Sequence, residues 1–150
     1  MIVTAELKDL KEILDLQYLA YQSEAKLFND YKIQPLTETL DELITEYNNG
    51  IILKLVIDNR IIGSIRAHEE NNTAYIGKLM VHPYYQHKGY GTKLLNEIEK
   101  YYPNKRYELF TSARSINNIK LYEKNGYRRF DIKNFDGIDF IFLEKMSPKI

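Results

Sequence analysis

The stretch from Ala74 to Leu95 constrains the fold of this chain more than any other. It opens with a short run of apolar and β-favouring residues that ends before Pro83, because proline has no N–H to offer a sheet. Two glycines, Gly89 and Gly91, follow, and apolar residues then recur at helical spacing. The stretch therefore predicts a strand, a glycine loop and the start of a helix.

A glycine loop that leads into a helix can bind an anion. The first N–H groups of a helix have no intrahelical partner and carry about half a positive charge, so a phosphate satisfies both deficits. Glycines lack a Cβ and let the backbone approach an oxygen closely, while Gln86 and Lys88 can add donors at the rim. This pattern predicts a phosphate site, although two glycines at such a junction are more often only a turn.

The size and charge of the chain exclude several classes of protein. With 150 residues and no shift in composition, we expect one domain over residues 1–150. Its 21 basic and 21 acidic residues balance, so no general field attracts nucleic acid or an anionic membrane. No apolar run reaches the roughly 18 residues of a membrane span, and the N-terminus lacks the pattern of a signal peptide. We expect a cytoplasmic protein that binds neither nucleic acid nor a membrane.

The composition gives no indication of a metal site or of a catalytic thiol. The chain has no cysteine, which excludes disulfides and thiolate metal sites. Its three histidines, His68, His82 and His87, show no paired spacing of the kind that metal ligands have. We therefore predict no metal site.

Hydrophobic periodicity and turn signals predict the element order β-α-α-β-β-β-α-β-α-β-β. Residues 29–36 contain Asn-Asp and a proline, which break the helical pattern between the first two helices. The strands are predicted at residues 2–4, 51–57, 61–68, 74–81, 106–111, 127–132 and 138–143. The helices begin near residues 10, 39, 91 and 116.

This order of elements resembles the GNAT family of N-acetyltransferases over essentially the whole chain. Two motifs carry the resemblance. Gln86-x-x-Gly89-x-Gly91 matches the family's Arg/Gln-x-x-Gly-x-Gly/Ala pyrophosphate loop, and residues 118–127, NIKLYEKNGY, match a helix near its end. The resemblance implies a GNAT-type α/β fold: a mixed, mostly antiparallel central sheet flanked by helices and splayed between its fourth and fifth strands.

The resemblance implies acetyl-coenzyme A as the co-substrate. Backbone amides of the glycine loop would hold its pyrophosphate, and the edge of the fourth strand would hold its pantetheine arm. In many relatives an asparagine stands where this chain has Ser115; nearby asparagines are substitutes that fit a helix cap equally well. The implied cofactor-binding residues are Leu79, Met80, Val81, Gln86, His87, Lys88, Gly89, Tyr90, Gly91, Thr92, Asn117 and Asn118.

Tyr122 is the catalytic residue that the resemblance implies. An amine that attacks a thioester forms an oxyanion and then expels a thiolate, and a phenol at the sulfur can protonate that thiolate as it leaves. Without the resemblance, a tyrosine on an amphipathic helix is more often a packing residue. The family places the oxyanion donor, a backbone N–H, at an irregularity of the fourth strand, near Leu79 or Met80 in this chain.

The general base is not determined by the sequence. Several relatives carry an acidic residue on the fourth strand where this chain has Lys78. The remaining candidates are Glu24, Glu69, Glu70 and a chain of water molecules.

The first interpretation is an N-acetyltransferase that moves acetyl from acetyl-coenzyme A directly to a primary amine of a small molecule or a peptide. Residues 21–36 and 134–137 would select the acceptor, and no run of acids there announces a polyamine. A second interpretation is a non-catalytic module that senses acetyl-coenzyme A. A nucleotide-binding protein is a weaker third, because the G-x-x-x-x-G-K-[ST] loop is missing. A homodimer is left open.

Overall fold

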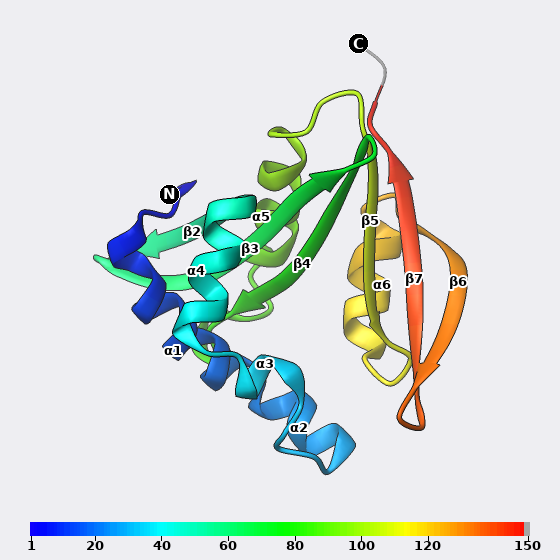
Figure 1. Ribbon diagram of the computed structural model, residues 1–150, viewed down its shortest axis with the longest axis horizontal. Helices are drawn as coiled ribbons and strands as arrows, with labels where there is room; N and C mark the ends of the chain where they lie inside the picture. Colours follow the sequence, from blue (N-terminus) through cyan, green and yellow to red (C-terminus); the bar gives the residue numbers. More distant parts are fainter. Residues whose placement is uncertain (149–150) are drawn as a thin grey trace.

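The computed structural model describes residues 1–148, which form a seven-stranded sheet with helices on both faces (Figure 1). The sheet order is β1-β2-β3-β4-β5-β7-β6. The strands are β1 (Ile2–Thr4), β2 (Ile51–Ile57), β3 (Arg60–Glu70), β4 (Thr73–Val81), β5 (Arg106–Ser112), β6 (Arg128–Phe135) and β7 (Ile138–Met146). The helices are α1 (Leu10–Ala20), α2 (Gln22–Phe28), α3 (Gln34–Thr37), α4 (Leu40–Asn49), α5 (Tyr90–Glu99) and α6 (Ile116–Lys124), with one-turn 3₁₀ helices η1 (Leu7–Asp9) and η2 (Pro83–Tyr85).

The sheet is mixed and mostly antiparallel, as predicted. Only β4 and β5 run parallel among the strand pairs of residues 1–148. The helical region differs from the prediction in two places. The first predicted helix divides at Tyr21 into α1 and α2, where side chains of Gln22 and Ser23 bond the carbonyls of Tyr18 and Ala20 and compete with the helical ladder. The predicted break at residues 29–36 also contains the single turn α3, with Pro35 in its first turn.

The sheet is splayed between β4 and β5, which confirms that feature of the predicted fold. The two strands pair only where Thr73–Tyr75 meets Arg106–Glu108, and then diverge toward the lower part of Figure 1. From Ile76 to Val81, β4 therefore has no strand bonded to its β5 side. Those backbone groups are free to bind an extended ligand.

A β-bulge in β4 accompanies the splay. Ser64 of β3 pairs with Met80, but Arg66 pairs with Gly77, so β4 holds one residue more than β3 in this interval. Lys78 has φ +50°, the left-handed conformation. A bulge bends its strand and increases the local twist, which turns β4 away from β5.

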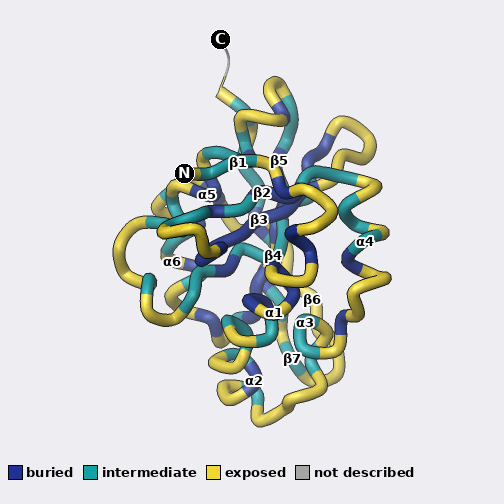
Figure 2. The backbone as a smooth tube through the Cα atoms, turned by 90° about the vertical axis from the view of Figure 1, so that its left-hand side faces the viewer, coloured by how far each residue is buried: buried dark blue, intermediate teal, exposed yellow. Residues whose placement is uncertain are grey.

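Two hydrophobic cores lie on opposite faces of the sheet. One packs α5 and α6 against the strands, and the other packs α1 and α4 against β2, β3 and the Met80 side chain. The buried segments of β2, β3 and β4 run through the middle of Figure 2, whereas α2 lies at the periphery and buries only Ala25. The helix α2 is thus held by fewer core contacts than α1.

Among residues 1–148, no helix is both long and apolar enough to cross a membrane, and no group of three or more His, Asp and Glu side chains could hold a metal ion.

Candidate active site

A cavity of about 770 Å³ lies at the splay, and residues of β4, β5, α2 and α3 line its wall. Its wall carries more acidic than basic side chains, although the chain as a whole is neutral. The acidic residues are Glu24, Asp30, Glu46, Glu108 and Asp136, and the basic ones are Arg66 and Lys78.

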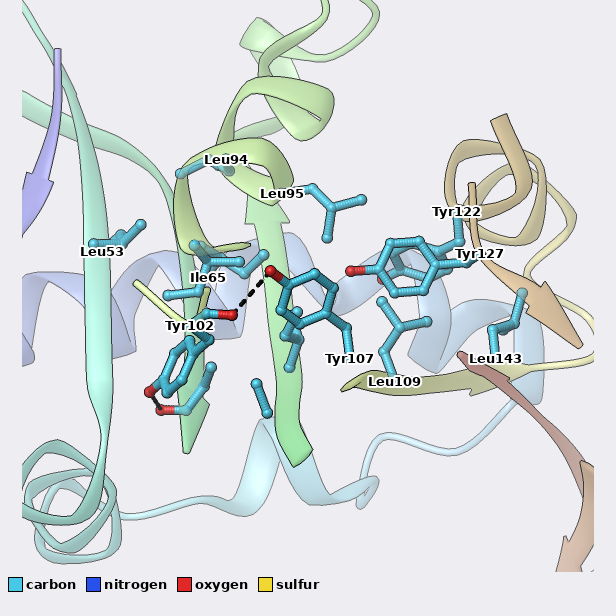
Figure 3. Packing of buried hydrophobic residues seen from close by; sticks show 14 of the residues in the cluster. Leu53, Ile65, Leu94, Leu95, Tyr102, Tyr107, Leu109, Tyr122, Tyr127 and Leu143 are labelled. Carbon is cyan, nitrogen blue, oxygen red and sulfur yellow. Dashed lines mark hydrogen bonds between the residues drawn. The ribbon is translucent and has the colours of Figure 1, made fainter. Parts of the chain in front are cut away.

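Tyr122 points from α6 into this cavity. Its side chain is 8% exposed and its ring lies 6.2 Å from that of Tyr127 (Figure 3). Within residues 1–148, its hydroxyl forms no hydrogen bond. Burial, and then the nearby Glu24 carboxylate, raises the pKa of Tyr122 well above its ordinary value. The phenol is therefore protonated at neutral pH and is a weaker acid than an ordinary tyrosine.

Of the three carboxylates that the sequence left open as base, only Glu24 lines the cavity. Burial raises its pKa, against a hydrogen bond from Ser115 and the charge of Lys78. Glu69 instead pairs with Lys105 at 3.2 Å, and Glu70 is exposed at the end of β3. Glu24 is the one carboxylate of the three that can take a proton inside the cavity.

The start of α6 contributes Ser115 and Asn118. Ser115 is the N-cap residue, but its Oγ donates to Glu24 Oε1 at 3.0 Å and caps nothing. Asn118 lines the cavity, whereas Asn117 is exposed and lies outside its wall. This hydrogen bond joins the start of α6 to α2 at the cavity.

The bulge in β4 contributes backbone groups and the Lys78 side chain to the cavity wall. Lys78 and Leu79 line the cavity at the point where the free edge of β4 begins to curve. Met80 is 3% exposed and packs against α1 and α4, so only its backbone is available to a ligand. Val81 O accepts a hydrogen bond from Gln86 Nε2 at 3.1 Å. The Gln86 side chain therefore closes the strand end onto the glycine loop.

The glycine loop has the geometry of an anion site. Gly89 has φ +83° and is the N-cap of α5, with no side chain capping the helix. The N–H groups of Tyr90, Gly91 and Thr92 accordingly have no helical carbonyl to bind. His87 also has positive φ, and residues 86–89 are mostly exposed. Successive free N–H groups at a helix N-terminus form a concave nest for a phosphate.

Two residues of the loop also hold α5 against α6. A Cβ at Gly91 would lie 3.2 Å from Leu121 Cδ2, so glycine there permits close helix packing. Thr92 Oγ1 accepts a hydrogen bond from Asn125 Nδ2 at 3.3 Å. Gly91 thus has a packing role that the sequence did not indicate.

Comparison with known proteins assigns the family. Residues 8–127 match the model of the Acetyltransferase (GNAT) family. This chain belongs to the GNAT acetyltransferase family. The prediction made from the two motifs is therefore confirmed, together with acetyl-coenzyme A as the acyl donor that the GNAT family uses.

Individual relatives of this GNAT chain act on different acceptors. A spermidine N(1)-acetyltransferase of Thermoplasma acidophilum is 32% identical over 111 residues, which cover 71% of this chain and 67% of that protein. The structure of the PaiA N-acetyltransferase of the same organism in complex with coenzyme A has a TM-score of 0.78 at 21% identity, covering 98% of both chains. The ribosomal-protein-S18-alanine N-acetyltransferase of Escherichia coli has a TM-score of 0.79 at 17% identity, covering 99% of this chain and 95% of that one.

One polar cluster of this GNAT chain was missed in the sequence. Arg66, only 6% exposed, bonds Glu46 and Gln17 and lies 3.5 Å from Glu38 Oε1. Burial would raise the pKa of Glu38, but hydrogen bonds from Gln17 and Glu46 and the charge of Arg66 together hold that pKa below its usual value. An arginine inside an apolar strand requires buried acidic partners. That signal could have located one side of the cavity.

Proposed function

We propose that residues 1–150 form one GNAT domain that transfers the acetyl group of acetyl-coenzyme A directly to a primary amine of a small molecule or peptide. One observation supports this most. Tyr122, Glu24 and the Lys78–Leu79 bulge share one cavity beside the unpaired edge of β4. A proton donor, a proton acceptor and a backbone irregularity are the three parts that amine acetylation from a thioester requires.

The residues of the loop and of β4 fit acetyl-coenzyme A. Its diphosphate matches the uncapped N-terminus of α5, where Gly89 leaves open space on its Cβ side. Its pantetheine arm carries amide groups, which match the backbone groups on the unpaired edge of β4 at residues 76–80. When bound, it supplies the thioester that carries the acetyl group.

Glu24 acts first, by taking a proton from the acceptor ammonium, so that the neutral nitrogen can attack the thioester carbonyl. Backbone N–H groups at the bulge stabilise the resulting oxyanion. The carbon–sulfur bond then breaks, and the Tyr122 hydroxyl gives its proton to the departing sulfur. Burial raises the pKa of Tyr122 and so weakens it as an acid, and the transfer therefore depends on the position of the hydroxyl beside the sulfur. The products are an acetamide and a free thiol.

The charge of the cavity favours an acceptor with more than one ammonium group. Glu46 is paired with Arg66 and Glu108 with Arg106, so within residues 1–148 three acidic residues of the wall, Glu24, Asp30 and Asp136, and one basic residue, Lys78, form no ion pair. A relative named for spermidine acetylation is consistent with such an acceptor. We therefore place diamines and polyamines ahead of uncharged amines and peptide N-termini.

An acceptor screen with acetyl-coenzyme A, read as free thiol released, tests the function. The panel contains spermidine, diamines of varied length, a monoamine of matched length, amino acids and a short peptide with a free N-terminus. We expect turnover with at least one primary amine and higher kcat/KM for diamines than for the matched monoamine. Binding of acetyl-coenzyme A without turnover of any amine would contradict the enzyme and favour a sensor.

A further inference from the structure

Lys78 places a primary amine inside the cavity that is proposed to acetylate primary amines. It is the residue at the β4 bulge with φ +50°, so its side chain leaves the ordinary alternation of the strand and reaches the cavity wall. Within residues 1–148, its ammonium group forms neither an ion pair nor a hydrogen bond. By contrast, the ammonium group of Lys54 bonds a carboxylate at 2.7 Å, and that of Lys145 bonds another at 2.9 Å.

Four charged groups surround Lys78, each from a different part of the fold. Arg66 comes from β3 and Glu24 from α2, while Glu38 precedes α4 and Glu46 lies on it. Burial, and then the charge of Arg66, lowers the pKa of Lys78, although the three carboxylates oppose the shift. A lowered pKa increases the fraction of neutral amine, which is the nucleophilic form.

We propose that Lys78 is itself an acetyl acceptor and that its Nζ takes the acetyl group of acetyl-coenzyme A within the same molecule when no amine occupies the cavity. This inference rests on the acetyltransferase function proposed above. Lys78, Glu24 and Tyr122 line one cavity, so an acetyl group bound beside Tyr122 would share that cavity with the amine, which favours an intramolecular step. The acetyl group can react with Lys78 from the same position, beside the bulge and Tyr122, that it would occupy for transfer to a free amine.

The step balances with residues already described. The neutral Nζ of Lys78 attacks the thioester carbonyl carbon, and the carbon–sulfur bond breaks. Tyr122 gives its hydroxyl proton to the sulfur, while the proton that Nζ loses on forming the amide passes to Glu24. The products are N-acetyl-lysine at position 78 and free coenzyme A. The cavity then loses its one cation that forms no ion pair within residues 1–148, and the acetyl group occupies space that an acceptor amine would use.

Mass spectrometry of the intact chain after incubation with acetyl-coenzyme A and no amine tests the proposal. We expect one acetyl group at Lys78, in at least about tenfold greater yield than at any other lysine, because the step is intramolecular. Thiol release should stop near one equivalent per chain, and its first-order rate should not depend on protein concentration. Lys78→Arg should abolish this release, whereas Lys93→Arg, a change at an exposed position on α5, should leave it unchanged.

Two further measurements separate the failure modes. Tyr122→Phe should slow acetylation of Lys78 by about a hundredfold or more, without slowing chemical acetylation of exposed lysines. Labelling of Lys78 that equals that of exposed lysines, or that Tyr122→Phe does not affect, overturns the inference. If free amines are acetylated while Lys78 stays unmodified, the inference fails and the proposed function stands. If neither Lys78 nor any amine is acetylated, both fail.

Discussion

At the scale of single residues, the hydroxyl groups of the four buried tyrosines distinguish three packing residues from the proposed proton donor. Tyr102 OH donates to Ala67 O, and Tyr107 OH donates to Tyr102 O at 3.0 Å (Figure 3). Tyr107 OH also lies 3.0 Å from Glu99 O, and Tyr127 OH donates to Glu99 Oε2 at 2.8 Å. Tyr122 belongs to the same hydrophobic cluster but, within residues 1–148, leaves its hydroxyl unbonded toward the cavity. A hydroxyl that opens into a cavity is available to a ligand.

Tyr122→Phe and Tyr127→Phe form a matched pair that tests this distinction. We expect Tyr122→Phe to lower kcat by about a hundredfold to ten-thousandfold and to leave the free energy of unfolding nearly unchanged. Tyr127→Phe should have the opposite profile, losing about 1–2 kcal/mol of stability with its bond to Glu99 while kcat stays close to wild type. Steady-state turnover and urea unfolding measure both. Equal turnover of wild type and Tyr122→Phe would leave Tyr122 as a packing residue.

Glu24→Gln tests the proposed base through its pH dependence. Burial raises the pKa of Glu24, and the base must be ionised, so wild-type kcat/KM should rise through that raised pKa and then level off. Glu24→Gln should be slower and should lack this rise. Glu69→Gln, at a surface ion pair, is the control and should match wild type in both respects. A wild-type profile retained by Glu24→Gln would assign the proton to water.

The same variant has a consequence for stability. A carboxyl whose folded pKa lies above its unfolded value contributes stability below the unfolded pKa and loses it as pH rises through the folded pKa. At pH 7 ionised Glu24 therefore carries a burial cost that a neutral amide avoids. We expect Glu24→Gln to unfold at an equal or higher temperature than wild type while its activity falls, a combination that general misfolding cannot produce.

At the scale of elements, local patterns predicted most of the sheet and missed the features that shape the site. The strand predicted at residues 51–57 has those bounds because its apolar run is continuous and ends in a turn. The bulge at Lys78 could not be predicted, since it depends on register against β3. The approach of Glu24 to Ser115 joins residues 91 positions apart, which no local pattern encodes. Tyr122 was found only through its family motif.

The loop before α5 yields an element-scale prediction at Gly89. Its φ of +83° strains a β-branched side chain, but asparagine adopts such angles readily, and a Cβ added there would meet no heavy atom within 4 Å. We expect Gly89→Asn to fold normally and to weaken acetyl-coenzyme A binding, because a side chain would stand beside the free N–H groups. Calorimetric titration measures the Kd. An unchanged Kd would remove the loop from the cofactor site.

Gly91 cannot serve the same purpose. Any side chain there meets Leu121, so Gly91→Val should destabilise the contact between α5 and α6 as well as the loop. A lowered affinity in that variant would not separate binding from packing. Gly89 is the position at which a substitution separates cofactor binding from packing.

At the scale of the whole molecule, the splay opens the sheet into two parts that stay joined by one hydrophobic core, which packs α5 and α6 against strands of both parts. One part holds β1 to β4 with α1 to α5, and the other holds β5 to β7 with α6 (Figure 1). Three paired positions of β4 and β5 and the bond of Tyr127 to Glu99 also join the two parts, and the bond between Ser115 and Glu24 joins α6 to α2 at the cavity. The balanced charge of the chain is divided unevenly by this arrangement, which leaves an acidic cavity.

A ligand that lies between β4 and β5 should therefore stabilise the molecule against global unfolding. At a free concentration of 100 times its Kd, acetyl-coenzyme A should add about 2.7 kcal/mol to the free energy of unfolding, provided that it does not bind the unfolded chain. ATP offers phosphates to the N-terminus of α5 but has no pantetheine arm for β4. We expect ATP at the same concentration to raise the melting temperature much less than acetyl-coenzyme A does. We also expect hydrogen exchange of the backbone amides of residues 76–81 to slow with acetyl-coenzyme A and not with ATP. Equal shifts with both ligands would mean that phosphate binding supplies the stabilisation and that the free edge of β4 contributes nothing to it.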